Sequence, residues 1–461
     1  MTKVAVVGCT HAGTFATQSI LTAHPDWEVH VFERNDTLSF LSCGIALWVG
    51  DHVSDPNKMF YSSPAALAEL GATMHMCTDV TALDAKGKTL KYRGLDEPEG
   101  VEHELTFDKL VVTTGSKPVV PPFAGLEQAM EAERVLLCKN WDHAKQIKEL
   151  CTGAKSVTVI GAGYIGAELA EQLSEAGVAV TLVDMTEHVL ARTMDADVAA
   201  AVEQAYCEHG VKLALGEKVE SFHLTDGGVV VKTDQAEHET EYAILAIGFS
   251  PRTELWAGQF EALPNGAIRV DQYQRATLAG ESEPSQDVFA AGDSCSVIYN
   301  PTHTDFYNPL ATNAVRQGLV VGANMLEPTQ AYLGTQGTSA VQLYDLSIAG
   351  TGLTLQNAEQ MGVDAQAVTI VEDYRPAFLL TTAPVTCTLV WEKGTRRVLG
   401  AQFMCTQPDV GQAANAVSIA IAAGFTIDQL AGVDLLFQPQ FCQPINYIGS
   451  VAMAAVTAAN A

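Results

Sequence analysis

Two segments of the chain share one pattern, and this repeat constrains the fold more than any other feature. The first runs VAVVGCTHAG over residues 4–13 and continues to VHVFE, which ends at Glu33. The second runs VTVIGAGYIG over residues 157–166 and continues to VTLVD, which ends at Asp184. In each, a β-branched apolar run meets a glycine turn, a helix-like stretch follows, and a second apolar run ends in an acidic residue. The repeat predicts two βαβ units.

The glycines of the second unit fit dinucleotide binding. Gly161 and Gly163 allow a tight turn and the close approach of a pyrophosphate, and Gly166 lets the helix lie against the strand. Asp184 stands where a carboxylate can hold ribose hydroxyls. The first unit departs from this fingerprint, because Thr10 occupies the place of the middle glycine.

The first unit nevertheless keeps Gly8, Gly13 and the terminal acid Glu33. Both units could instead be tight turns of an α/β protein that binds no nucleotide. Strand, helix and terminal acid recur in both copies, which makes that interpretation weak. Two nucleotide sites are therefore expected.

Later apolar runs indicate how the two units are completed. KLVVTTGSKP at 109–118 and YAILAIGFSP at 242–251 are expected to return the chain to the nucleotide sheets. DVFAAGDSC at 287–295 is a strand pattern that ends at Asp293, where a ligand can reach the carboxylate, and a helix follows over 311–322. From about residue 325 an α+β pattern begins. Its last stretch, 449–461, is expected to be a frayed tail or a helix that packs on a partner.

Charge and cysteine content exclude several classes of protein. The chain has 26 basic and 54 acidic residues, a net charge of −28, which disfavours extended nucleic acid as a partner. The apolar run at 4–8 is too short for a signal peptide or a membrane span. Ten cysteines show no C-x-x-C pair and no metal-ligand spacing, so no metal site is expected and a reducing cytoplasm is the predicted location.

Cys43 is the candidate for redox chemistry. It lies in LSFLSCGIALWVG at 38–50, before an expected helix whose dipole is expected to favour the thiolate. The alternative is a small buried apolar residue. Flavin disulfide reductases place a second cysteine five residues on, but that position holds Trp48. A redox-active Cys43 would therefore cycle alone between thiolate and sulfenic acid.

His11 lies inside the first glycine turn, at the expected start of a helix. The helix dipole there disfavours the imidazolium, so the ring is available as a base near neutral pH. A phosphate or backbone contact is an equally good interpretation of the position. The other eleven histidines show no pairing, and His188, His209 and His303 are expected at the surface or in loops.

The order of the motifs resembles that of one family over the whole chain. GCTHAG, SFLSCGI, VVTTGSKP, VIGAGYIGAELAE, DVFAAGDS, LATNAVRQG, VEDYRP and LLFQPQF look like the flavin-dependent NADH oxidase, NADH peroxidase and coenzyme A disulfide reductase family. Within it the chain is most similar to the water-forming NADH oxidases of lactic acid bacteria. The resemblance implies a glutathione-reductase-like α/β fold: an FAD domain from 1–115 and 246–325, an NADH domain at 116–245, and a C-terminal α+β dimerisation domain at 326–461.

The resemblance also implies roles for individual residues. FAD would be held by Gly8, Thr10, Gly13, Glu33, Thr114, Gly115 and Asp293, and NADH by Gly161, Gly163, Tyr164, Ile165, Gly166, Asp184 and Gly248. The family's redox cysteine falls on Cys43 and its active-site histidine on His11. The implied enzyme is a cytoplasmic homodimer or dimer of dimers that oxidises NADH and reduces O2 to water.

Three other functions are alternatives to a water-forming NADH oxidase. A coenzyme A disulfide reductase is disfavoured because QPQF at 438–441 lacks a histidine to protonate a thiol leaving group. A peroxidase is disfavoured because its relatives carry arginine where this chain has Val315, and Arg316 lies about 100° further round a helix. A non-catalytic NADH-sensing flavoprotein would not need Cys43.

Overall fold

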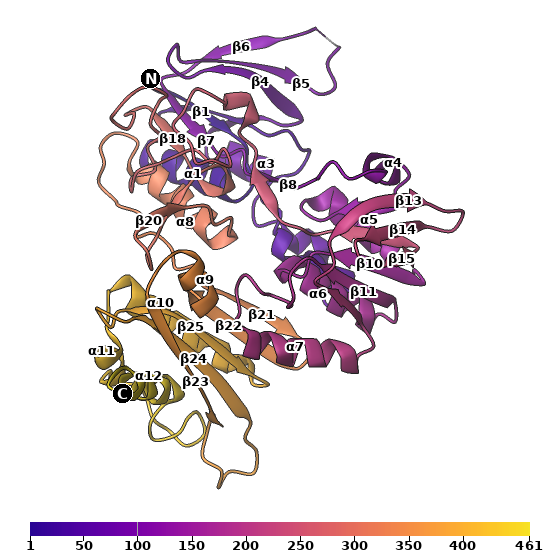
Figure 1. Ribbon diagram of the computed structural model, residues 1–461. Helices are drawn as coiled ribbons and strands as arrows, with labels where there is room; N and C mark the ends of the chain where they lie inside the picture. Colours follow the sequence, from indigo (N-terminus) through magenta and orange to yellow (C-terminus); the bar gives the residue numbers. More distant parts are fainter. Residues whose placement is uncertain (99) are drawn as a thin grey trace.

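The computed structural model describes residues 1–98 and 100–461, whose elements gather into three groups (Figure 1). The first group is built on a parallel sheet in the order β18-β7-β1-β2-β3. Helices α1 and α8 pack on one face of this sheet, and the antiparallel strands β4, β5 and β6 cover the other. The elements are β1 (Lys3–Val7), α1 (His11–Ala23), β2 (Glu28–Phe32), β3 (Ala72–His75), β4 (Thr78–Asp84), β5 (Thr89–Gly94), β6 (His103–Thr106), β7 (Lys109–Val112), β18 (Val288–Ala290) and α8 (Ala311–Ala323).

The second group repeats this architecture. Its parallel sheet has the order β12-β11-β10-β16-β9, and a second antiparallel unit, β13-β14-β15, lies beside it. The elements are β9 (Val135–Leu137), α5 (Trp141–Cys151), β10 (Ser156–Ile160), α6 (Tyr164–Glu175), β11 (Ala179–Asp184), α7 (Ala196–Glu208), β12 (Lys212–Leu215), β13 (Val219–Leu224), β14 (Val229–Thr233), β15 (Glu237–Thr240) and β16 (Tyr242–Leu245). Both predicted βαβ units are present as β1-α1-β2 and β10-α6-β11, with their strands parallel.

A short antiparallel pair joins the first two groups. Strand β8 (Ser116–Pro118) leaves the first group, and β17 (Phe249–Pro251) returns to it. Ser116 lies opposite Pro251 and Pro118 opposite Phe249. The second group is therefore an insertion into the first, with its entry and exit side by side. The residue boundaries given above for the domains stay predictions.

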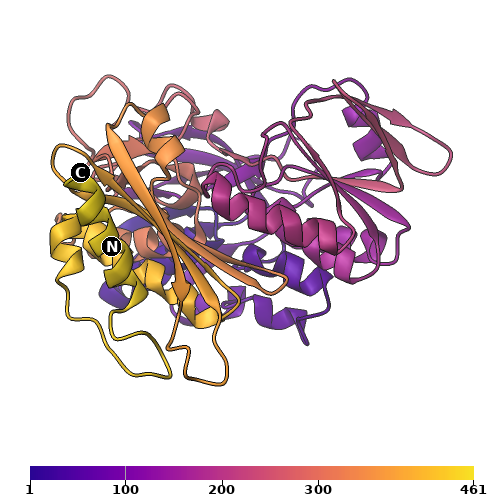
Figure 2. The same ribbon diagram turned by 60° about the horizontal axis from the view of Figure 1, so that its bottom comes forward.

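The third group is a five-stranded antiparallel sheet, β21-β22-β25-β24-β23, with helices on one face (Figure 2). Its elements are β21 (Ser339–Leu343), β22 (Leu346–Gly352), β23 (Ala365–Asp373), β24 (Pro384–Glu392), β25 (Val398–Cys405), α10 (Ala413–Ala422) and α12 (Tyr447–Ala459). The final stretch is a helix and not a frayed tail. Helix α12 packs on β23 and β24 of its own chain, because Val451, Ala452 and Ala455 are fully buried there.

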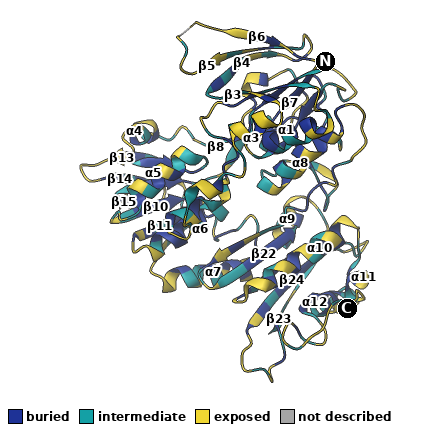
Figure 3. Cartoon of the chain, turned by 180° about the vertical axis from the view of Figure 1, so that it is seen from behind, coloured by how far each residue is buried: buried dark blue, intermediate teal, exposed yellow. Residues whose placement is uncertain are grey.

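The remaining elements are short connectors. They are α2 (Ile45–Val49), α3 (Pro64–Glu69), α4 (Leu126–Glu131), α9 (Leu355–Gln360), α11 (Ile427–Ala431), β19 (Val297–Tyr299) and β20 (Thr304–Phe306). Buried residues concentrate in the three sheets and the helix faces against them (Figure 3). Among the described residues, no helix is long and apolar enough to cross a membrane.

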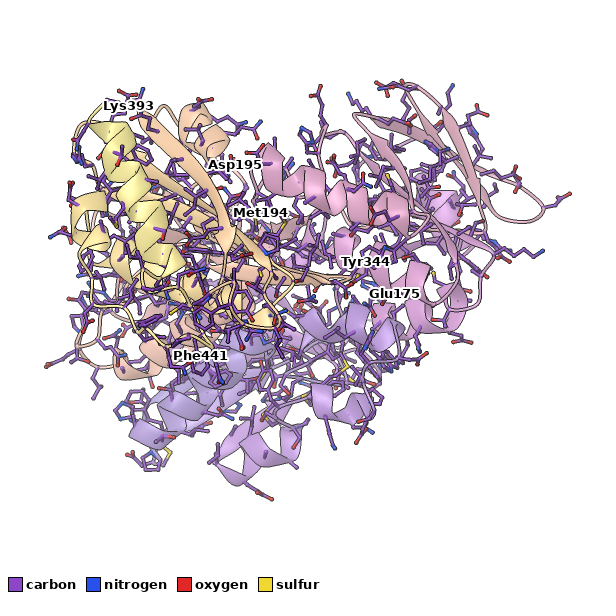
Figure 4. All side chains as sticks on the ribbon, turned by 90° about the horizontal axis from the view of Figure 1, so that it is seen from below. Glu175, Met194, Asp195, Tyr344, Lys393 and Phe441 are labelled. Atoms are coloured by element: carbon purple, nitrogen blue, oxygen red, sulfur yellow. The ribbon has the colours of Figure 1, made fainter. Side chains whose placement is uncertain are left out.

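The third sheet is fastened to the second group. Figure 4 shows Met194 and Asp195 at the start of α7 beside this sheet, and Tyr344 near Glu175 of α6. The Asp195 backbone N–H donates to Gln402 Oε1 at 2.8 Å, and the Tyr344 ring stacks on His209 with 3.7 Å between centroids. His209 is exposed, as the sequence suggested, and also contributes to the contact between the two groups.

Candidate functional site

The first glycine turn closes tightly between β1 and α1. Gly8 has φ +93°, and a Cβ on it would lie 2.3 Å from the Thr113 carbonyl oxygen, so only glycine fits. A Cβ on Gly13 would lie 2.0 Å from the Gly8 carbonyl oxygen, so α1 rests directly on the turn. Thr10 precedes this 13-residue helix and its side chain makes no capping hydrogen bond. The N–H groups at the start of α1 are therefore available to an anionic ligand.

A cavity of about 760 Å³ surrounds this turn, which is within the usual size range of ligand sites. Every residue expected to hold FAD lines it except Gly13, which supports the turn from behind; the lining members are Gly8, Thr10, Glu33, Thr114, Gly115 and Asp293. The cavity joins a helix start suited to a pyrophosphate, a carboxylate suited to ribose hydroxyls, and a far end at Lys139 and Trp141. These residues fit a bound FAD.

Glu33 is held by its own neighbourhood. Its Oε2 accepts a hydrogen bond from the Cys9 N–H at 2.7 Å, and its Oε1 accepts from Asn35 N at 2.9 Å and Asn35 Nδ2 at 2.6 Å. Burial raises the pKa of the Glu33 carboxyl above its ordinary value, which these donors partly offset. These hydrogen bonds thus hold the Glu33 side chain at the end of β2 and orient its carboxylate before any ligand binds.

At the far end of the cavity, three polar groups form a network that includes a lysine missed in the sequence. Lys139 Nζ donates to Ser116 Oγ at 2.8 Å and to Asp293 Oδ2 at 3.1 Å, and Ser116 Oγ donates to Asp293 Oδ2 at 2.6 Å. The ammonium also lies 4.0 Å from the centre of the Phe249 ring. Lys139 follows β9 in the inserted group and belongs to no motif, so no sequence pattern pointed to it.

Cys43 lies beside the cavity in a single 3₁₀ turn, Ser42–Gly44, just before α2. Its neighbour Ser42 lines the cavity, and the Cys43 side chain is exposed. Desolvation by the surrounding protein raises the pKa of the thiol, and the charge of Glu168 raises it further. This direction is opposite to the thiolate stabilisation expected from the helix dipole, and α2, with only five residues, is a short source of such a dipole.

No second thiol is available at the position where a dithiol would form. Trp48 occupies it, and its ring stacks on Trp141 with 4.7 Å between centroids. All ten cysteines are free, and most are buried.

His11 begins α1 and lines the same cavity. Its Nδ1 lies 2.6 Å from the Tyr61 hydroxyl oxygen, and the two rings stack with 5.6 Å between centroids. Burial lowers the pKa of His11, and Lys139 lowers it further while Asp293 opposes the shift. The neutral ring expected from the sequence is therefore favoured, with burial as the main cause.

The second glycine turn resembles the first closely. Gly161 has φ +106°, and a Cβ on Gly166 would lie 1.8 Å from the Gly161 carbonyl oxygen. Asp184 Oδ2 accepts from Ala162 N at 2.6 Å, and Oδ1 accepts from Thr186 N at 2.7 Å. A Cβ on Gly163 would meet nothing within 4 Å, so the start of α6 is open to a ligand.

Of the other residues expected to hold NADH, Gly248 and Ile165 lie near this turn, whereas the Tyr164 side chain is directed elsewhere. Gly248 follows the loop at Ala246, whose carbonyl oxygen faces Gly161. Ile165 is half-buried in the first turn of α6. Tyr164 turns toward the third group, where its hydroxyl lies 2.8 Å from Ser339 Oγ.

Two histidines pair, contrary to the sequence-based expectation. His30 Nδ1 lies 2.9 Å from His75 Nε2, and His30 Nε2 lies 2.7 Å from Glu28 Oε1. Burial lowers the pKa of His75, and the nearby His30 adds to the shift. The pairing comes from adjacent parallel strands that are far apart in sequence, so spacing along the chain could not reveal it.

Comparison with known proteins identifies the family. The model of the pyridine nucleotide-disulphide oxidoreductases matches residues 2–318, and the model of the dimerisation domain of the same enzymes matches 338–445. An NADH oxidase from Enterococcus faecalis is 45% identical over 98% of this chain and 99% of its own. A coenzyme A polysulfide/persulfide reductase from Pyrococcus horikoshii is 28% identical over 95% of each chain.

A solved structure is similar along the whole chain. The water-forming NADH oxidase from Lactobacillus brevis, bound to NADH, superposes with a TM-score of 0.95 and 50% identity, covering 100% of this chain and 99% of that one. The chain belongs to the pyridine nucleotide-disulphide oxidoreductase family. Membership confirms the predicted glutathione-reductase-like fold, the enzyme class of flavoprotein oxidoreductase, and FAD and NADH as cofactors.

Proposed function

We propose that this member of the pyridine nucleotide-disulphide oxidoreductase family is a water-forming NADH oxidase, in which 2 NADH, O2 and 2 H+ give 2 NAD+ and 2 H2O. The observation that carries the proposal is a lone thiol, Cys43, beside a cavity that His11 also lines, with Trp48 where a dithiol partner would stand. The similarity to the water-forming NADH oxidase from Lactobacillus brevis supports the same choice.

FAD, when bound in the cavity, supplies electron transfer from NADH to O2, which yields hydrogen peroxide after two electrons. The protein's part is to hold and cleave that peroxide. At rest, Cys43 is a thiol and His11 a neutral imidazole, because the raised pKa of the first and the lowered pKa of the second both favour uncharged groups. The backbone brings their segments together, since Ser39 N donates to the Cys9 carbonyl oxygen at 3.3 Å.

The cleavage step balances within this pair. His11 accepts the thiol proton, the Cys43 sulfur bonds to one peroxide oxygen, and the O–O bond breaks. His11 returns the proton to the departing hydroxide, which gives water and Cys43 sulfenic acid. NADH and one further proton then reduce the sulfenic acid to the thiol, releasing the second water and NAD+.

Two features favour an oxidase over the alternatives. Arg316 Nη2 donates to Asn313 Oδ1 at 2.7 Å, and its guanidinium lies 5.4 Å from the centre of the Tyr332 ring, so this cation is engaged by these two side chains. Val315 stands where peroxidase relatives carry arginine. QPQF at 438–441 offers no histidine for a thiol leaving group, which disfavours disulfide reduction.

The test is the Cys43→Ser variant. We expect it to retain FAD and NADH oxidation but to release about one H2O2 per NADH, because the nucleophile that forms the sulfenic acid is lost. An oxygen electrode measures this directly, since catalase added after the NADH is spent returns oxygen from any peroxide.

Cys207→Ser is the matched control, because Cys207 is also exposed but lies at the end of α7. It should form water as the unmodified enzyme does. If Cys43→Ser still makes only water, the lone-thiol mechanism is wrong. Flavin bleaching by NADH without oxygen uptake in the unmodified protein would instead select the NADH-sensing alternative.

We further propose that the enzyme is a homodimer, or a dimer of dimers, that works in the reducing cytoplasm. Its free cysteines fit that compartment. Large apolar side chains are exposed on two loops of the third group: Phe378, Leu380, Leu436, Phe437, Phe441 and Ile445. Burial of these side chains in a subunit interface would remove them from water. Light scattering of the purified protein tests this, and a monomer at micromolar concentration would contradict it.

A further inference from the structure

Tyr61 contacts His11 directly, although no motif pointed to it. Its hydroxyl oxygen lies 2.6 Å from His11 Nδ1, and its ring centroid lies 5.6 Å from that of His11 and 5.6 Å from that of Phe15. We propose that Tyr61 is a positioning residue for His11, which keeps a proton on Nδ1 and leaves Nε2 free to accept one. The inference rests on the proposed function, because it concerns His11 as the group that moves the proton.

The segment carrying Tyr61 is fastened to both parts of the site. Ser39 Oγ donates to the Ser62 carbonyl oxygen at 2.8 Å, and Ser62 N donates back to Ser39 Oγ at 2.9 Å. Leu41 N donates to the Met59 carbonyl oxygen at 2.8 Å. The segment before Cys43 is thus paired with the segment around Tyr61, and Ser39 N ties both to the glycine turn.

The hydrogen bonds that Ser39 makes with Ser62 and Cys9, called the Ser39 clamp below, depend on an unusual backbone conformation of Ser39. Ser39 is fully buried and has φ +59°, in the left-handed region that non-glycine residues seldom adopt. Such a conformation persists when surrounding contacts fix it, and its three hydrogen bonds do so. The Tyr61 hydroxyl therefore meets His11 on a rigid framework.

The direction of the hydrogen bond follows from the proton that His11 must handle. A neutral imidazole carries one N–H, so Nε2 can accept the thiol proton only if the resting proton is on Nδ1. After acceptance both nitrogens carry protons, and Nδ1 still needs an acceptor. The Tyr61 oxygen serves in both states when it accepts from Nδ1. If Tyr61 donated to Nδ1, the bond would have to break during each proton transfer.

A phenol suits this role because it adds no charge. A carboxylate at the same place would stabilise the imidazolium and raise the pKa of His11, as it does in catalytic triads. Burial raises the pKa of Tyr61, which keeps the phenol neutral. Asp293 and Lys139 are the charged groups that act on His11, and their effects oppose one another. Tyr61 thus fixes the tautomer while the ring stays a neutral base.

The test is Tyr61→Phe, which keeps the ring and removes only the hydroxyl. We expect normal FAD content and normal anaerobic flavin reduction by NADH, but peroxide cleavage slowed roughly 2- to 10-fold, the effect of losing one neutral hydrogen bond. The readout is the fraction of consumed oxygen released as H2O2, measured from pH 5 to 8. The rise in peroxide release on the acid side should move to lower pH, because the imidazolium loses an acceptor.

Two comparison variants make the result specific. Phe15→Leu removes the aromatic neighbour of Tyr61 but leaves the hydroxyl, and it should release no extra peroxide. His11→Ala combined with Tyr61→Phe should release no more peroxide than His11→Ala alone, because Tyr61 acts through His11.

Failure of this inference can be told apart from failure of the proposed function. If His11→Ala releases peroxide and Tyr61→Phe does not, Tyr61 has no positioning role and the proposed function stands. Additive effects in the double variant would also overturn the inference, because Tyr61 would then act independently of His11. If His11→Ala itself releases no peroxide, the acid–base role of His11 fails, and the inference fails with it.

Discussion

The two glycine turns have the same backbone plan and differ in the residues that begin their helices. Each starts from a glycine of positive φ, Gly8 or Gly161. In each, a carboxylate at the end of the next strand accepts a backbone N–H of the turn, at 2.7 Å for Glu33 and 2.6 Å for Asp184. The helices, however, begin with His11 in the first turn and with Tyr164 in the second.

The residue before each helix also differs between the two turns, Thr10 in the first and Gly163 in the second. Thr10 has φ −91° and Gly163 has φ −75°, so neither position demands glycine for its backbone conformation. Space around Gly163 is open, which suits close approach of a ligand. The comparison teaches that the turn keeps its geometry and its cavity although Thr10 replaces the middle glycine of the fingerprint.

Among the substitutions that test the difference between the two turns, His11→Ala should have the largest effect. We expect peroxide cleavage to slow about 10²- to 10⁴-fold, the usual contribution of a general acid–base group, so that H2O2 escapes even with Cys43 present. Anaerobic flavin reduction by NADH should remain nearly unchanged in stopped-flow measurements. A loss of FAD, or flavin reduction slowed as much as turnover, would show that His11 supports the cofactor instead.

A paired substitution tests the shared backbone plan. Gly8→Ala and Gly161→Ala each place a Cβ within 2.5 Å of a backbone oxygen at positive φ. We expect each substitution to weaken the binding of the nucleotide at its own turn about tenfold or more. The backbone strain of alanine at positive φ is about 1–2 kcal/mol, before any steric clash of the Cβ is counted. Gly8→Ala should lower the FAD content of the purified protein. Gly161→Ala should keep FAD and raise the KM for NADH; loss of FAD in both would mean that the turns are not independent.

Asp184 tests cofactor choice in the second turn. No Arg or Lys occurs at 185–188, so we expect the carboxylate to repel a 2′-phosphate and NADH to be preferred over NADPH. Asp184→Ala should lower the ratio of kcat/KM for NADH to kcat/KM for NADPH about tenfold, which is the effect of removing one charged hydrogen-bond partner. Glu187→Ala, which removes a nearby exposed charge, should narrow it less. Equal kcat/KM for both cofactors in the unmodified enzyme would contradict the prediction.

The smallest expected effect is a difference in pH response between the turns. The pKa of His11 is lowered, so the ring stays neutral through pH 7 and becomes protonated only below the ordinary histidine value, about 6.5. Once protonated it cannot accept the thiol proton, so peroxide release should rise severalfold as the pH falls below 6. Flavin reduction by NADH should change little over the same range. Peroxide release that instead rises with pH would contradict the assignment of His11 as the proton acceptor.

The sequence was most informative where backbone geometry demands particular residues. Both βαβ units follow from glycines and apolar runs, and the strands that close the sheets follow from apolar segments ending in small residues. The residues expected to hold FAD, Gly13 excepted, meet at one cavity because they occur at strand ends or helix starts of one sheet. Such positions are fixed by local rules that a single sequence carries.

The sequence was least informative about contacts between distant segments. Lys139 reaches Asp293 from the inserted group, and Tyr61 reaches His11 through the Ser39 clamp. For Cys43 the sequence shows the start of the local helix, whereas desolvation by the surrounding protein, which raises the pKa of the thiol, depends on the assembled fold. The position of α12 likewise depended on a sheet whose strands had to be assembled first.

The antiparallel contact between β8 and β17 has a consequence for how the chain is synthesised. Until β18 emerges from the ribosome, the outer edge of β7 lacks its neighbour, while the whole inserted group is being made. An open edge of this kind can pair with other chains. The pairing of β8 with β17 brings the two ends of the insertion together. The entropic cost of closing this loop grows only slowly with the number of residues between the two strands. We expect the nascent inserted group to fold first and thereby to deliver β18 to its place beside β7.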